Sequence, residues 1–156
     1  MITNINKNIT IHKNKIEEKY IAVWEQSKWL VLSSYFFIIP AVYAYINKLY
    51  YYSILLTCTS LISANYWRKA TYSWRRNTDL IFAKISFTVF VTNGIIYVRQ
   101  IHYIITGYSG LCILLYCYYL SGKLLEVKNN NWYKYHMLFH LIMMYEQLII
   151  LDSIQN

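Results

Sequence analysis

Long apolar runs separated by short polar breaks dominate this chain, and each run has the length that crosses a bilayer. A helix rises 1.5 Å per residue, so about 20 apolar residues span the ~30 Å of hydrocarbon. Pro40 falls inside the first run and predicts a kink there, which a membrane helix tolerates. The runs predict five membrane helices, at residues 29–46, 50–67, 79–98, 101–120 and 133–151.

The residues before the first run have a different pattern. Residues 1–15 are rich in Asn, Ile and Lys without a clear period, as expected of a tail. From Ile16 to Ser27, apolar side chains recur at helical spacing with charged ones elsewhere around the helix, which favours an amphipathic helix on the membrane surface. A helix docked on the bundle fits the same pattern. The predicted parts are a tail at 1–15, the interfacial helix at 16–27, a transmembrane bundle at 28–152 and a C-terminal tail at 153–156.

Composition supports a membrane protein of one domain. The 156 residues are 57% hydrophobic and 14% charged, whereas soluble domains carry about 25% charged residues. One Pro and four Gly argue against a turn-rich β protein. The three cysteines lie inside apolar runs without paired spacing, so we expect no disulfide framework. The predicted fold class is an all-α integral membrane bundle of about five transmembrane helices.

The net charge of +8 is interpreted first as a topology signal, because basic residues of membrane proteins concentrate in cytoplasmic loops. With the N-terminus inside, the fifteen Lys and Arg residues fall on the cytoplasmic side except Lys48 and Arg99 outside and Lys84 within the bilayer. All five Trp lie near the same interfaces. We predict a multi-pass protein with a cytoplasmic N-terminus, in an endomembrane or a viral or host membrane. Nucleic acid is not an expected partner, and the oligomeric state stays open.

Four polar residues are predicted to meet at the cytoplasmic face. His136 and His140 are four apart, so both imidazoles project from one face of the last helix. Ser63 lies near the end of the second span and Asp79 at the start of the third. An ionisable group inside a membrane bundle is costly enough to be a functional candidate. These residues are therefore the candidate site.

Their order along the chain resembles a known signature. Ser63-x-x-x-Trp67, then Asp79, then His136-x-x-x-His140 is similar to the Ser-x-x-x-His, Asp, His-x-x-x-His pattern of the ceramidase-like membrane hydrolase superfamily. That group includes alkaline ceramidases, progestin and adiponectin receptors, and glycosylphosphatidylinositol-remodelling lipid hydrolases. The resemblance covers residues 60–79 and 133–146. Trp67 stands at the place of the first histidine, and the family has seven helices rather than five.

The resemblance implies a metal-dependent hydrolase of a lipid amide or ester. In the family three histidines hold zinc, and the Asp and Ser lie beside the metal and its water. Trp67 cannot ligate a metal because its indole nitrogen has no free lone pair. The implied ligand set is then His136, His140 and Asp79, which suits zinc and, less readily, ferrous iron. If Asp79 is not a ligand, it is the implied general base, and Ser63 bonds the water or the oxyanion.

Two other classes of function remain open. The first is a non-catalytic scaffold or lipid-binding protein that keeps the ceramidase-like fold, with membrane lipids as partners. In that case the two histidines bond headgroups, carbonyls or each other, and the basic loop Arg68–Arg76, interleaved with aromatic residues, suits anionic headgroups. The second is a small transporter, which needs a polar path. Only Lys84, Asn93 and Glu146 hint at one.

Two further features lie deeper in the predicted bundle. Glu146, with Gln147 beside it, is expected to pair with a polar group such as Asn93 on another helix, or to pass protons. Gly107-x-x-Gly110 in the fourth span predicts close helix packing, because glycines let neighbouring backbones approach.

Overall fold

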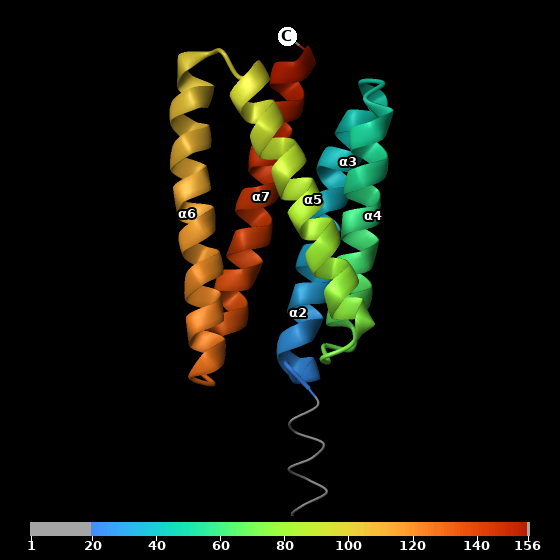
Figure 1. Cartoon of the computed structure of the whole chain (residues 1–156), viewed down its shortest axis with the longest axis vertical. Coiled ribbons are helices and arrows are strands. Elements are labelled where there is room, and N and C mark those ends of the chain that lie inside the picture. The colour runs from blue at the N-terminus through green and yellow to red at the C-terminus, as the bar shows by residue number, and fades with distance from the viewer. Residues whose placement is uncertain (1–19, 156) are drawn as a thin grey trace, which may run out of the picture.

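The computed structural model describes residues 20–155, and its regular structure is helical throughout. The chain passes up and down along one axis, with α2 and α3 forming a single rod (Figure 1). An all-α bundle is therefore confirmed. The elements are α2 (Trp24–Ser34), the 3₁₀ turn η1 (Tyr35–Phe37), α3 (Ile38–Ile46), α4 (Tyr50–Trp67), α5 (Trp74–Tyr97), α6 (Ile101–Glu126) and α7 (Trp132–Gln155).

Four helical rods in the described part are long and apolar enough to cross a membrane. They are Trp24–Ile46, Trp74–Tyr97, Ile101–Glu126 and Trp132–Gln155. The remaining predicted span, residues 50–67, corresponds to α4 and has the expected bounds. Helix α4 carries a polar face of Thr59, Ser60 and Ser63, which is buried in the bundle. These hydroxyls lower the hydropathy of α4. A multi-pass helical bundle is supported, and the count of five spans stays a prediction.

The outer surface of the bundle is far more apolar than that of a soluble protein, and polar side chains are buried beside its apolar core. Many Ile, Leu, Val and Tyr side chains on the outside of the bundle are exposed, among them Ile54, Ile95 and Ile105, each more than 60% exposed. The interior contains Ser33, Gln147 and other polar side chains that are almost fully buried. Water would penalise such an apolar surface, whereas lipid does not. This distribution supports membrane insertion independently of helix length.

The predicted kink at Pro40 coincides with a change of helix type. Pro40 has no N–H to donate to the carbonyl of Phe36, and its ring crowds that carbonyl. The backbone tightens into the 3₁₀ turn Tyr35–Phe37 between α2 and α3. The rod therefore continues through a local irregularity instead of breaking.

Several boundaries differ from the sequence prediction. Helix α5 begins at Trp74 rather than at residue 79, and α6 continues to Glu126. Helix α7 extends to Gln155, so most of the predicted tail 153–156 is helical. The interfacial helix 16–27 is not confirmed: residues 16–19 lie outside the described residues, as does the tail 1–15, and the helix begins only at Trp24.

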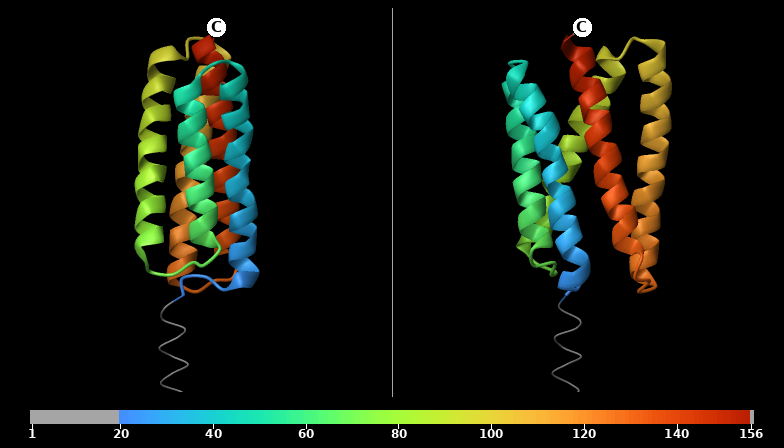
Figure 2. Two further views of the ribbon diagram at one scale, coloured as in Figure 1. Left: turned by 90° about the vertical axis from the view of Figure 1, so that its right-hand side faces the viewer. Right: turned by 180° about the vertical axis from the view of Figure 1, so that it is seen from behind.

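Helix α7 is the element around which the others are arranged. It packs along α6 and also contacts α2, α3 and α5, whereas α5 and α6 diverge from the connection that joins them (Figures 1 and 2). At its C-terminal end Asp152 accepts hydrogen bonds from the hydroxyls of Tyr43 on α3, at 2.8 Å, and Tyr103 on α6, at 3.2 Å. Asp152 thereby joins three helices at one end of the bundle.

Candidate functional site

The four predicted site residues form two pairs at the end of the bundle where α2 begins. The rings of His136 and His140, on successive turns of α7, meet edge to face with centroids 4.9 Å apart. The hydroxyl of Ser63 on α4 hydrogen bonds to the carboxyl of Asp79 on α5. Ser34 of α2 donates its own hydroxyl to Ser63 Oγ at 3.0 Å. The sequence prediction that these residues share one end is therefore supported.

The two pairs do not combine into a metal centre. Within residues 20–155, no group of three or more His, Cys, Asp or Glu side chains lies close enough to hold a metal ion. His140 Nδ1 lies 2.8 Å from Ser33 Oγ, and His136 Nδ1 lies 3.3 Å from Ser121 Oγ. A catalytic zinc needs three protein ligands. The described side chains therefore do not fit the set His136, His140 and Asp79, and metal binding stays a prediction.

The histidines are instead part of a column of rings. Trp67 stands edge-on to His136 with a centroid distance of 5.0 Å, and Trp132 lies 5.9 Å from Trp67. Aromatic pairs at these separations stabilise one another beyond the area that they bury. At the inner end of the column, Phe37 of η1 meets His140 at 5.2 Å. We call this the aromatic column, made of Trp132, Trp67, His136, His140 and Phe37.

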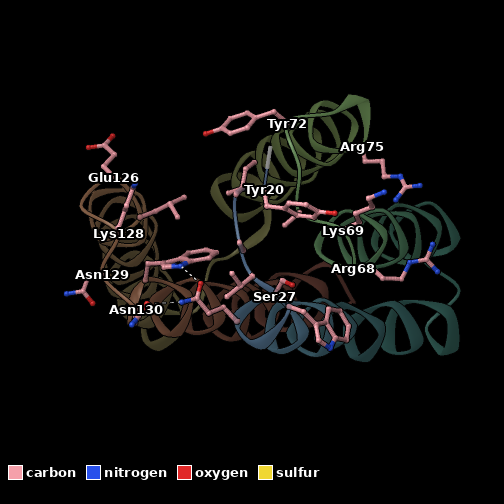
Figure 3. A pocket seen from close by; sticks show the side chains of 18 residues that line it. Tyr20, Ser27, Arg68, Lys69, Tyr72, Arg75, Glu126, Lys128, Asn129 and Asn130 are labelled. Atoms are coloured by element: carbon pink, nitrogen blue, oxygen red, sulfur yellow. Dashed lines mark hydrogen bonds between the residues drawn. The ribbon is translucent and has the colours of Figure 1, made fainter. Parts of the chain in front are cut away.

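Next to Trp132, the end of the bundle contains a large open hollow, which Figure 3 shows from close by. Its volume is about 1420 Å³. Three segments frame it: residues 20–23 before α2, the α4–α5 connection 68–73, and the α6–α7 connection 127–131. We call this end of the molecule the basic end.

Backbone contacts hold the three framing segments in place. The N–H of Ile21 donates to the carbonyl of Ala70 at 2.8 Å, and Tyr20 forms an antiparallel bridge with Thr71. On the opposite side, Gln26 links α2 to α7, because its Oε1 accepts the indole N–H of Trp132 at 3.0 Å. The walls of the hollow are therefore tied to one another and to the aromatic column.

The lining of the hollow is strongly basic. Arg68, Lys69 and Arg75 gather on one side, with Lys128 and the acidic Glu126 on the other (Figure 3). Within the described residues the one ion pair is the local Lys28–Glu25 contact on α2. The four lining cations thus have no carboxylate partner in that part of the chain. Their charge is available to an anion from outside.

Sequence reasoning found some of these residues and missed others. The basic loop around Arg68 and Arg75 was identified from its composition. The role of Ser33 and Ser121 as hydroxyl partners of the histidines was missed, because single serines inside apolar runs have no recognisable pattern. Lys128 was placed on the same face by topology, although its position across the hollow depends on the packing of α6.

Comparison with family models, curated proteins and solved structures finds no match to this chain. The likeness to the ceramidase-like hydrolases therefore rests on the short motifs alone.

Proposed function

We propose that this chain is a multi-pass membrane protein that binds anionic lipid headgroups in the hollow at its basic end. The observation that carries the proposal is the set of four cations around one hollow, none with a carboxylate partner among the described residues. Anionic lipid attracts Lys and Arg near the membrane surface with about 1 kcal/mol per residue. A headgroup phosphate or carboxylate would supply the missing negative charge.

The aromatic side chains at the same end agree with a headgroup depth. Trp24, Tyr72 and Trp74 are all more than half exposed there. Amphipathic rings of this kind concentrate at membrane–water interfaces. Together with the concentration of Lys and Arg, this favours a cytoplasmic basic end, with the N-terminus inside and α7 ending outside.

Binding of a soluble short-chain phosphatidylserine to the detergent-solubilised protein tests the proposal. The variant Arg68→Gln/Lys69→Gln removes two of the four cations and keeps side chains of moderate length. We expect saturable binding to the unmodified chain and about thirtyfold weaker binding to the variant, because two surface charges contribute about 1 kcal/mol each. A short-chain phosphatidylcholine is the neutral comparison.

A matched control removes the same charge from the other end of the molecule. Lys48→Gln/Arg99→Gln changes residues in the α3–α4 and α5–α6 connections, away from the hollow. We expect its affinity to stay close to that of the unmodified chain. Equal loss in both variants would show a non-specific charge effect, and no preference for phosphatidylserine over phosphatidylcholine would refute headgroup binding.

A metal-dependent hydrolase of a lipid amide or ester is the second candidate. One observation favours it: Ser63 and Asp79 are hydrogen bonded, as a general base and its neighbour would be. The lack of a third ligand beside His136 and His140 in the described chain weighs against it. Elemental mass spectrometry of the purified protein and of the variant His136→Ala/His140→Ala measures their metal content and thereby tests this candidate. Near-stoichiometric zinc or iron that is lost in the variant would establish the site, and metal-free folded protein would exclude it.

A further inference from the structure

A second cavity lies in the other half of the bundle, between α5, α6 and α7. Its volume is about 290 Å³, and apolar side chains such as Phe87, Leu111 and Leu114 make up much of its lining. Its lining comes from residues 87–99, 103–114 and 143–150. Figure 1 shows how the three helices are arranged. The lining residue Ile95 is 65% exposed on the outside of α5, and in a bilayer that surface would face lipid.

Two polar side chains of α7 line this apolar cavity without partners. Glu146 is 9% exposed and Gln147 is 1% exposed. No described residue forms a hydrogen bond or ion pair with the Glu146 carboxyl, and Gln147 Oε1 is a buried acceptor without a donor. The expected partner Asn93 bonds elsewhere, because its Oδ1 accepts from Tyr52 at 3.1 Å. Unpartnered acceptors at this depth are costly unless a ligand satisfies them.

Two glycines of α6 make room for the carboxyl. A Cβ atom on Gly110 would overlap the carboxyl group of Glu146, and one on Gly107 would lie 3.5 Å from its Oε2. The predicted close approach at Gly107-x-x-Gly110 is therefore an approach of a side chain rather than of a backbone. The space left by the missing side chains of Gly107 and Gly110 accommodates the Glu146 carboxyl at the cavity.

We propose that this cavity binds a lipophilic amine, with its ammonium group on Glu146 and Gln147 and its apolar body among the aromatic and leucine side chains. An ammonium supplies three donors and a positive charge, which suits a carboxylate beside a carbonyl. The other ionisable side chains that line the cavity are Arg99, Tyr103 and Tyr108. Arg99 lies in the α5–α6 connection and forms no ion pair with Glu146 in the described structure.

Saturable binding of radiolabelled dodecylamine to the protein in phosphatidylcholine nanodiscs tests this inference, with empty nanodiscs subtracted. Unlabelled dodecanol serves as a competitor of equal chain length that lacks the charge. We expect dodecylamine to compete about tenfold or more better than dodecanol, since hydrogen bonds to a charged group exceed neutral ones. Equal competition by the alcohol, or no saturable binding, would overturn the proposal without any variant.

Three variants locate the site. Glu146→Gln keeps the shape and removes the charge, so we expect about a tenfold loss of dodecylamine affinity or more. Gly110→Ala should weaken binding as well because its methyl displaces the carboxyl. Gly122→Ala makes the same change on the same helix, but there the added Cβ would have no neighbouring side chain or helix within 4 Å. We expect this variant to keep the affinity of the unmodified chain. Unchanged binding in Glu146→Gln, with a normal melting temperature, would refute the site.

Discussion

At the scale of single residues, the two buried tryptophans of the aromatic column differ in one hydrogen bond. Trp67 and Trp132 are 5% and 3% exposed, so each buries nearly its whole ring. Trp132 Nε1 donates to Gln26, whereas Trp67 Nε1 is buried without a partner among the described residues. Trp67 also occupies the place of a histidine in the resembling signature. In this structure the ring of Trp67 packs edge to face against the ring of His136.

This difference gives a matched pair of substitutions. Both substitutions replace a buried indole by a smaller ring, but Trp132→Phe also loses the bond and leaves Gln26 short of a donor, whereas Trp67→Phe removes an N–H that has no partner among the described residues. We expect Trp132→Phe to lower the free energy of unfolding by about 1 kcal/mol more than Trp67→Phe. Reversible unfolding of both variants in one detergent measures it. Equal destabilisation, or a larger loss for Trp67→Phe, would contradict the assigned bonds.

At the scale of elements, two helices end in the same way. After α3, Lys48 has φ 62°, and Leu49 N–H donates to the Ala44 carbonyl at 2.8 Å. After α6, Lys128 has φ 54°, and Asn129 N–H donates to the Leu124 carbonyl at 2.9 Å. This is the Schellman arrangement, in which glycine is the usual left-handed residue. Lysine in its place stores strain.

Replacing that lysine by glycine should therefore stabilise the protein. We expect Lys48→Gly to raise the free energy of unfolding by about 1 kcal/mol, since glycine has no Cβ to clash. Lys84→Gly is the matched control: Lys84 is an exposed residue inside α5, where glycine should lower stability by about 1 kcal/mol. If both variants lose stability alike, the left-handed assignment at Lys48 is wrong.

The apolar runs in the sequence predict which parts of the chain are helical. The predicted helix ends are less accurate, because polar residues also occur in the terminal turns of helices. The bounds of α4 followed from the run between the Asn47–Lys48 turn and Arg68. The sequence predicts the start of α5 at residue 79 rather than at Trp74, because Arg75 and Arg76 are typical of a polar loop. Trp74 is exposed and the buried residues of α5 begin only at Ser86, so the first turn of α5 forms without a buried apolar face.

Local pattern also could not predict which polar groups meet. That Ser33 would face His140 depends on the register between α2 and α7, which no short motif specifies. The grouping of Ser63 with Asp79 was predictable only through topology, because both lie at the same end of successive spans. The separation of that pair from the two histidines depends on how the helices pack. This packing determines whether Asp79, His136 and His140 come close enough to bind one metal ion.

At the scale of the whole molecule, the bundle has two unlike ends and an apolar outer surface between them. At one end, the hollow is lined by four cations that have no carboxylate partner among residues 20–155, and Asp152 joins its two tyrosines at the other end. The exposed apolar belt between them is suited to lipid. A protein of this form would sit in the bilayer with the hollow at headgroup depth. Anionic lipid is the ligand that its charge favours.

Hydrogen exchange in nanodiscs tests headgroup binding most directly, because it reports position as well as binding. The unmodified protein is compared in phosphatidylcholine alone and in a mixture with phosphatidylserine. We predict slower exchange of the backbone amides in residues 68–73 and 127–131 with phosphatidylserine, and no change in residues 47–49 and 98–100 at the opposite end. Equal exchange in both lipids, or slowing at both ends alike, would contradict the proposal that the basic hollow binds anionic headgroups.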